Sequence, residues 1–174
     1  MKKITFIRHA EKEYNNNKGP PGCYQHDPDI YPSISDISKK LYEENKFDLV
    51  ISSPFKRTRH TSRKILNDLT LNLQIIIDNN ISEYLGFQKP KYGKASICPE
   101  TKRYIQPLLG VESLKELKKR LSIFYNSLST YQSDNILVVT HGINIDFLYQ
   151  MINGKKLEER PKNLEGFIHN LYLI

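Results

Sequence analysis

The chain has 174 residues, which is the size of one domain, and the 39% of them that are hydrophobic can bury one core, so wholesale disorder is excluded. Its longest apolar runs are far shorter than the ~18 residues of a membrane span, which excludes a transmembrane helix. The formal net charge of +7 favours anionic ligands and does not by itself separate nucleic acid from a phosphorylated small molecule.

The first half of the chain is predicted to form a strand, a loop, a helix and a second strand, in that order. The expected elements are an alternating strand over 3–7, a loop of Asn, Lys, Gly and Pro over 15–22 and a short buried strand over 48–51. Between the loop and the second strand, Ile34, Ile37 and Leu41 have the spacing of the apolar face of a helix.

Two helices of this half have sequence signals at their N-termini. Ser33 or Ser35 can cap the first helix, because a serine side chain accepts hydrogen bonds from the N–H groups of the first turn. Ser52-Ser53-Pro54 begins a second helix that is expected to run to Leu69, since serine can cap it and proline suits its first turn. The second strand therefore leads directly into a helix.

The second half continues the alternation of strands and helices. In chain order, the expected elements are a strand over 73–77, a long amphipathic helix over 113–128, a strand over 136–139, a helix over 143–152 and a terminal strand within 165–174. Residues 84–110 are rich in Lys, Pro and Gly and lack periodicity, so a short lid or insertion is expected there.

This alternation predicts an α/β fold with three α/β/α layers, a mainly parallel central sheet and the short lid insertion. Residues 1–174 are expected to form this single domain. Cys23 and Cys98 lie far apart, and charged residues from Arg8 onward interrupt any export signal. Reduced thiols and a cytoplasmic location are therefore expected.

Polar residues of a compatible kind follow three of the expected strands. Arg8 and His9 follow the first strand, Arg57 lies shortly after the second, and His141 follows the strand over 136–139. Because parallel sheets bind ligands beyond the carboxyl ends of their strands, these side chains are aimed at one rim. Arg57 also lies in the first turn of its helix, where unpaired N–H groups and the helix dipole favour an anion.

Each of these residues also has a plain structural interpretation when taken alone. A single histidine beside a strand is more often a structural group than a catalyst. Arg57 can be a solvated helical arginine like Arg59 or Arg63. The coincidence of several such residues at one rim favours a functional site.

Four segments carry the pattern further: Arg8-His9-Ala10 with Asn15, residues 52–61, Ser82-Glu83-Tyr84-Leu85-Gly86, and residues 138–142 ending in Thr140-His141-Gly142. In this order they resemble the signature segments of the histidine phosphatase superfamily, which contains cofactor-dependent phosphoglycerate mutases and many phosphatases. Weaker similarities are residues 34–38 and Glu112-Ser113 with Arg120. The resemblance spans nearly the whole chain.

The resemblance implies phosphoryl transfer through a phosphohistidine. The implied catalytic residues are His9 as nucleophile, Glu83 as proton donor and His141. Taken alone, Glu83 can also be an ordinary surface carboxylate. The implied phosphate-binding residues are Arg8, Asn15, Arg57, His141 and Gly142. Phosphoryl transfer mainly needs positioning and positive charge around the phosphoryl oxygens, which arginines supply, so no metal and no cofactor are expected.

Some positions depart from the family pattern. Ala10 replaces the usual glycine, Lys12 stands where a serine or threonine often touches the phosphate, and Ser38 replaces a glycine that leads into a helix. None of these changes removes an implied catalytic group. The mutases of the family are usually longer, with a larger insertion and a tail over the site, so the short insertion here favours hydrolysis.

We therefore expect a phosphatase that acts on a phosphorylated small molecule or a phosphoprotein, with neither nucleic acid nor a membrane as partner. The alternatives are a phosphotransferase of the phosphoglycerate mutase type and a catalytically silent phospho-ligand binder. A metal site at Cys23, His26, Asp27 and Asp29 matches no strong zinc spacing. A nucleic-acid-binding module is disfavoured because no recognition motif accompanies the dispersed basic residues.

Overall fold

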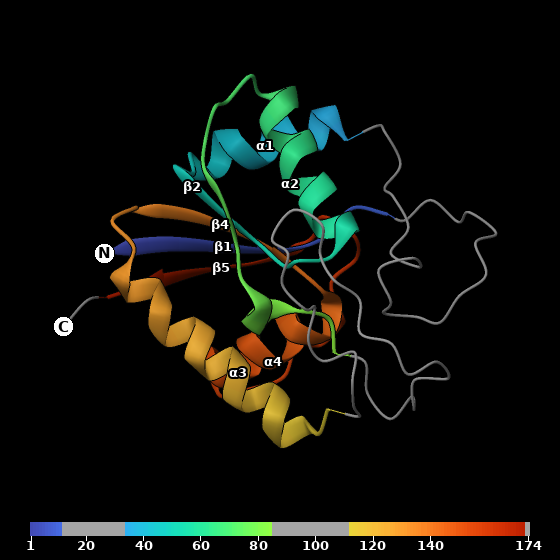
Figure 1. Cartoon of the computed structure of the whole chain (residues 1–174), viewed down its shortest axis with the longest axis vertical. Helices are drawn as coiled ribbons and strands as arrows, with labels where there is room; N and C mark the ends of the chain where they lie inside the picture. The colour runs from blue at the N-terminus through green and yellow to red at the C-terminus, as the bar shows by residue number, and fades with distance from the viewer. Residues whose placement is uncertain (12–33, 85–111, 173–174) are drawn as a thin grey trace.

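A five-stranded sheet in the order β3-β2-β4-β1-β5 forms the centre of the computed structural model, which describes residues 1–11, 34–84 and 112–172 (Figure 1). The strands are β1 (Lys2–Arg8), β2 (Leu49–Ser52), β3 (Ile75–Ile77), β4 (Asn135–Thr140) and β5 (Gly166–Leu171). The first four are mutually parallel where they pair, and β5 runs antiparallel to β1. The expected α/β fold with a mainly parallel sheet is confirmed.

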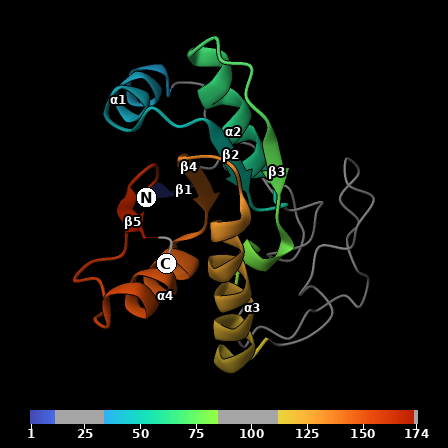
Figure 2. The ribbon, with the colours of Figure 1, turned by 90° about the vertical axis from the view of Figure 1, so that its left-hand side faces the viewer.

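Helices cover both faces of this sheet. They are α1 (Ser35–Asn45), α2 (Lys56–Asp68), α3 (Leu114–Ser127) and α4 (Gly142–Asn153), with short 3₁₀ turns η2 (Asn79–Ile81) and η3 (Leu128–Thr130). Figure 2 shows α1 and α2 on one side of the strands and α3 and α4 on the other. The three-layer arrangement is therefore as predicted.

The central strand β4 is buried on both faces, as a parallel strand between two helical layers must be. Ile136 and Val138 pack into the core cluster that contains Leu117, Leu121 and Phe124 of α3. The alternate residues of β4 pack into the second cluster with Ile65 and Leu66 of α2. Period-two alternation thus divides one apolar strand between two cores.

Helix α1 differs from its sequence prediction at its start and in its buried face. Its N-cap is Ile34, which makes no side-chain cap, and Ser35 is already helical, while Ser33 lies outside the described residues. Ile37 is 47% exposed, and Ser38 and Asn45 are buried instead. The expected apolar face is confirmed at Ile34 and Leu41, which pack in the second cluster, and is wrong at Ile37. Ser38 and Asn45 can be buried because their polar side chains have hydrogen-bond partners that an apolar pattern does not reveal.

Those partners come from the helix itself and from distant elements. The Ser38 hydroxyl donates to the Ile34 carbonyl at 2.9 Å and to the Asp68 carboxylate of α2 at 3.3 Å. The Asn45 amide donates to the Leu41 carbonyl at 2.7 Å and accepts from the Thr5 hydroxyl of β1 at 3.1 Å. Satisfied in this way, polar groups can be buried at little cost.

Helices α2 and α3 begin in different ways, the first without a side-chain cap and the second with one. Phe55 is the N-cap of α2 and makes no side-chain cap, so the predicted serine cap is wrong. Helix α3 begins with a capping box in which the Ser113 hydroxyl accepts from the Glu116 N–H, and the Glu116 carboxylate accepts from the Ser113 N–H. Hydrogen bonds from the backbone and then the side chain of Ser113 lower the pKa of the Glu116 carboxyl.

The C-terminal strand β5 covers the edge of β1 and brings a loop to Arg8. The Arg8 N–H donates to the Glu165 carbonyl at 2.9 Å, and the Arg8 carbonyl accepts from the Leu164 N–H at 3.0 Å. The expected lid over 84–110 lies outside the described residues except for Tyr84. None of the described helices has both the length and the apolar content needed to span a bilayer.

Gly166→Ala should destabilise the protein, because a Cβ at this position would lie 1.7 Å from the Phe6 carbonyl oxygen and displace β5 from β1. We expect the free energy of unfolding, measured by urea denaturation, to fall by about 2–3 kcal/mol. Gly154→Ala is the control, since a Cβ there meets nothing within 4 Å and strain at φ +71° alone costs about 1 kcal/mol. Equal losses in the two variants would contradict the predicted steric conflict.

Candidate active site

Backbone hydrogen bonds continue beyond the ends of the strands and bring three loops together. The His9 N–H donates to the Thr140 carbonyl at 3.0 Å, and the Ser53 N–H donates to the Val139 carbonyl at 3.0 Å. Because β1 and β2 flank β4, the residues that follow all three strands meet at one edge of the sheet.

His9 is buried, and partners at both ring nitrogens select one tautomer. Its Nδ1 lies 2.7 Å from the Ala10 carbonyl oxygen, which can only accept, so Nδ1 carries the proton. Its Nε2 accepts from Arg57 Nε at 3.2 Å. In this neutral tautomer Nε2 holds an unshared electron pair, which is the state in which imidazole acts as a nucleophile.

Arg57 joins the other groups of the site. Its Nη2 donates to the Glu83 carboxylate in an ion pair and lies 3.4 Å from Nδ1 of His141. Its guanidinium carbon also lies 4.7 Å from the centroid of the Phe55 ring. With 3% of its surface exposed, Arg57 is not a solvated helical arginine, and Arg59 at 2% is not one either.

His141 is buried beside His9 at the N-terminus of α4. Its Nε2 lies 2.8 Å from the Ser53 hydroxyl, and its Nδ1 lies 3.9 Å from the Glu83 carboxylate. The centroids of the His9 and His141 rings are 5.4 Å apart, and the rings are inclined at 63°. The structure thus brings together His9, Arg57, Glu83 and His141, all of which the sequence predicted.

Glu83 is the most accessible of these four residues, with 29% of its side chain exposed. The segment before it is anchored by Arg120 of α3, which donates to the Asn80 carbonyl at 2.6 Å. The same guanidinium makes a two-bond pair with the buried Glu112 carboxylate. Glu112 and Arg120, weaker members of the sequence pattern, therefore support the turn that leads to Glu83.

Arg8 and Gly142 lie at the edge of the cluster, and Asn15 lies outside the described residues. The Arg8 guanidinium donates to the Pro161 carbonyl at 3.1 Å. Gly142 is the first residue of α4, and a Cβ there would lie 3.6 Å from Cδ of Arg8. Arg8 therefore runs beside a helix N-terminus, where N–H groups without helical partners and the dipole favour an anion.

The sequence patterns indicated Ser53 as a helix cap and placed Thr61 within a signature segment, and they gave neither of them, nor Asn144, a role in the site. The Thr61 hydroxyl accepts from the Ala10 N–H at 2.9 Å and donates to the Arg57 carbonyl at 2.6 Å, which links the loop after β1 to α2. The sequence held a signal for Thr61, because a threonine four residues after Arg57 lies one helical turn away and can bond to the Arg57 carbonyl. Asn144, a polar residue in an apolar helix and three residues after His141, was another.

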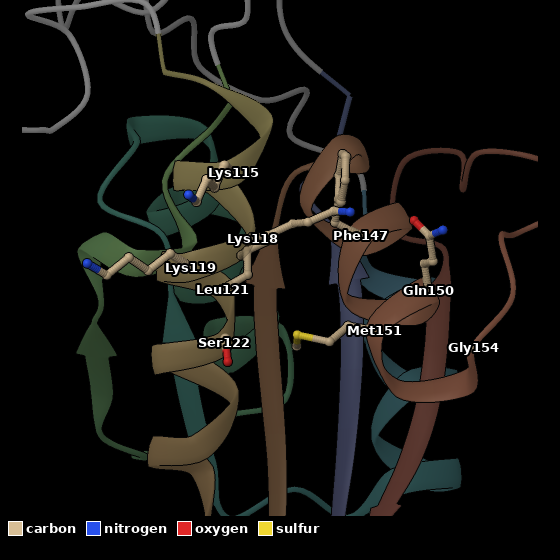
Figure 3. Close-up of a pocket in the computed structure, with 9 residues that line it drawn as sticks. All are labelled: Lys115, Lys118, Lys119, Leu121, Ser122, Phe147, Gln150, Met151 and Gly154. Carbon is tan, nitrogen blue, oxygen red and sulfur yellow. The ribbon is translucent and has the colours of Figure 1, made fainter.

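A separate cleft of about 530 Å³ lies between α3 and α4, and none of the four clustered residues lines it. Figure 3 shows Lys118 of α3 extending toward Phe147 of α4, and Met151 pointing into the space between the helices. In the described part of the chain, no group of three or more His, Cys, Asp or Glu could hold a metal ion. The alternative metal site at Cys23, His26, Asp27 and Asp29 lies outside that part.

The chain belongs to the histidine phosphatase superfamily, because the model of branch 1 of this family matches residues 4–166. The match confirms the resemblance that the signature segments gave. The matched residues include the clustered His9, Arg57, Glu83 and His141.

Individual relatives agree with this assignment. The protein of Hydrogenobacter thermophilus named "Putative phosphoserine phosphatase 2" is 26% identical over 173 residues, covering 91% of this chain and 82% of that protein. A Bacillus anthracis phosphoglycerate mutase has a TM-score of 0.68 at 20% identity, covering 96% of this chain and 86% of its own. For a phosphoserine phosphatase of Entamoeba histolytica with 3-phosphoglyceric acid, the TM-score is 0.56 at 18% identity, with coverages of 90% and 82%. The two solved structures show the shared fold.

Arg57→Ala should weaken the binding of inorganic phosphate about tenfold or more, because a hydrogen bond from a charged donor contributes ~1.5–3 kcal/mol. Isothermal titration calorimetry measures this affinity. Lys64→Ala is the control, since Lys64 is a cation of the same helix and pairs with Asp68. An Arg57→Ala protein with the wild-type affinity would place Arg57 outside the phosphate site.

Proposed function

We propose that the protein is a metal-independent phosphatase that hydrolyses a phosphomonoester, of a small molecule or a phosphoprotein, through a phosphohistidine on His9. The observation that carries this proposal is the His9 ring, whose Nδ1 donates to Ala10 and whose Nε2 accepts from Arg57. A buried, neutral imidazole beside a cation combines a nucleophile with charge for the phosphoryl oxygens.

In the first step, Nε2 of His9 attacks phosphorus and a P–N bond forms while the P–O bond to the leaving group breaks. Glu83, in its protonated form, gives its proton to the departing oxygen, which leaves as an alcohol. The incoming phosphoryl group replaces the Glu83 carboxylate as the partner of Arg57. Arginine side chains suit this role because their planar donors match phosphoryl oxygens.

In the second step, water attacks phosphorus and the P–N bond breaks. The Glu83 carboxylate accepts a proton from the water, so the residue returns to the state in which it began the cycle. Arg57, His141 and Arg8 surround the phosphoryl oxygens in both steps. The first N–H groups of α4, beginning at Gly142, add partial positive charge without a side chain.

Hydrolysis is favoured over transfer to a second phosphoglycerate for two reasons. The insertion expected at 84–110 is short for a mutase of this family. The Hydrogenobacter relative also carries the name of a phosphatase. Water is therefore the acceptor of the phosphoryl group.

Release of phosphate from phenyl phosphate in EDTA tests the proposal. His9→Ala should lose about a thousandfold or more of the wild-type rate, since it removes the nucleophile. His169→Ala is the matched control, because His169 lies on β5, where Nε2 contacts the Tyr125 hydroxyl at 2.9 Å. Wild-type turnover that EDTA abolishes, or that survives in His9→Ala, would contradict the proposal.

The pH dependence of kcat/KM should be bell-shaped, because His9 attacks only when Nε2 is unprotonated and Glu83 donates only when it holds a proton. Glu83→Gln should be slower and should lose the decline on the alkaline side. The phosphate of the substrate titrates equally for both enzymes, so the ratio of their profiles isolates Glu83. A flat wild-type profile would contradict these roles.

A further inference from the structure

The backbone that leads to Glu83 is bound from the side by a buried amide. Asn144, the third residue of α4, is 0% exposed. Its Nδ2 donates to the Ile81 and Ser82 carbonyls, each at 2.8 Å, and lies 3.0 Å from the Thr140 hydroxyl oxygen. Two of these three contacts therefore fall on the residues that directly precede Glu83.

The surroundings fix the orientation of this amide. Ile81 and Ser82 present carbonyl oxygens, which only accept, so the NH₂ end of Asn144 must face them. The Thr140 hydroxyl donates to the Ile81 carbonyl at 2.9 Å and can in turn accept from Asn144. The end of β4, the start of α4 and the turn before Glu83 are thus joined in one buried network.

We propose that Asn144 is a positioning residue that holds Glu83 where it can protonate the leaving group. The inference rests on the proposed function, because it takes Glu83 as the acid. Helix α4 begins directly after His141, so the bonds from Asn144 tie the backbone of the acid to the element that carries a phosphate-binding histidine. They maintain the 3.9 Å approach of the Glu83 carboxylate to Nδ1 of His141.

A second anchor of the same turn contacts a residue further from the acid. Arg120 donates to the Asn80 carbonyl, three residues before Glu83, whereas Asn144 reaches both intervening carbonyls. Without Asn144, Thr140 still donates to Ile81, but the Ser82 carbonyl loses its Asn144 donor. The turn should then remain folded while Glu83 moves relative to the leaving oxygen.

A misplaced acid has a kinetic signature that a general loss of stability lacks. A leaving group whose conjugate acid is strong, such as 2,4-dinitrophenolate, departs without a proton. A leaving group whose conjugate acid is weak, such as phenolate, needs one. Misplacing a catalytic group by about 1 Å can cost ~100-fold in rate. Asn144→Ala should therefore slow phenyl phosphate much more than 2,4-dinitrophenyl phosphate.

The experiment measures kcat/KM, which reports the steps up to phosphorylation of the enzyme, for both substrates. For Asn144→Ala we expect a decrease of about 10- to 100-fold on phenyl phosphate and less than about threefold on 2,4-dinitrophenyl phosphate. Asn45→Ala is the matched control, since Asn45 is also a buried helical asparagine that binds a carbonyl and a threonine hydroxyl. It should change the two substrates by the same factor.

Glu83→Gln separates a failure of this inference from a failure of the proposed function. If Glu83→Gln discriminates between the substrates and Asn144→Ala does not, the positioning role is overturned and the proposed function stands. If Glu83→Gln slows both substrates equally, Glu83 is not the acid and the inference is overturned, while the comparison of wild type with His9→Ala in EDTA decides the proposed function separately.

A second variant covers the case in which Asn144→Ala does not fold. Asn144→Ser keeps a hydroxyl donor and should give a smaller discrimination in the same direction. In the Glu83→Gln background the Asn144 substitution should add less than about threefold on phenyl phosphate, because the group that it positions is already gone. Equal decreases on both substrates in Asn144→Ser, or full additivity with Glu83→Gln, would overturn the inference.

Discussion

The buried guanidinium of Arg57 is the interaction on which the rest of the site depends. A charge with 3% exposure is tolerated only if acceptors surround it, and here they come from His9, Glu83 and His141. These three residues follow β1, the turn η2 and β4, which are far apart in the sequence, so the fold must bring them to one point. An anionic phosphoryl group offers the same guanidinium equivalent acceptor oxygens, which connects the stability of the site to its proposed chemistry.

The sheet order meets this requirement through its central strand. Strand β4 pairs with β1 on one side and with β2 on the other, so residues that follow three parallel strands emerge side by side (Figure 1). Helix α2 then carries Arg57 across this edge, and the 3₁₀ turn after β3 carries Glu83 toward it. Arg57 lies in the first turn of α2, at the positive end of the helix dipole, where a cation is disfavoured. Its carboxylate and imidazole partners offset this repulsion.

Sequence patterns predicted the strands and placed His9, Arg57 and His141 at one rim because these features are local, whereas Glu83 was implied by the family resemblance. Strand β4 is recognisable as an apolar run, and His9 and His141 directly follow strands. The patterns did not predict that Ser38 is buried while Ile37 is exposed, or that Asn144 supports the acid. The missing information is the identity of partners far along the chain, such as Ile81, which lies 63 residues from Asn144. Periodicity shows which positions are apolar and cannot show which polar groups will find acceptors.

Trapping the phosphorylated enzyme would show whether His9 carries the phosphoryl group during turnover. The protein is mixed with phenyl phosphate, quenched in alkali, which preserves a P–N bond, and digested for mass spectrometry. We expect one phosphoryl group on the peptide that contains His9, stable in alkali, lost in acid and missing from His9→Ala. Steady turnover with no such adduct, or a phosphoryl group on another residue, would contradict this expectation.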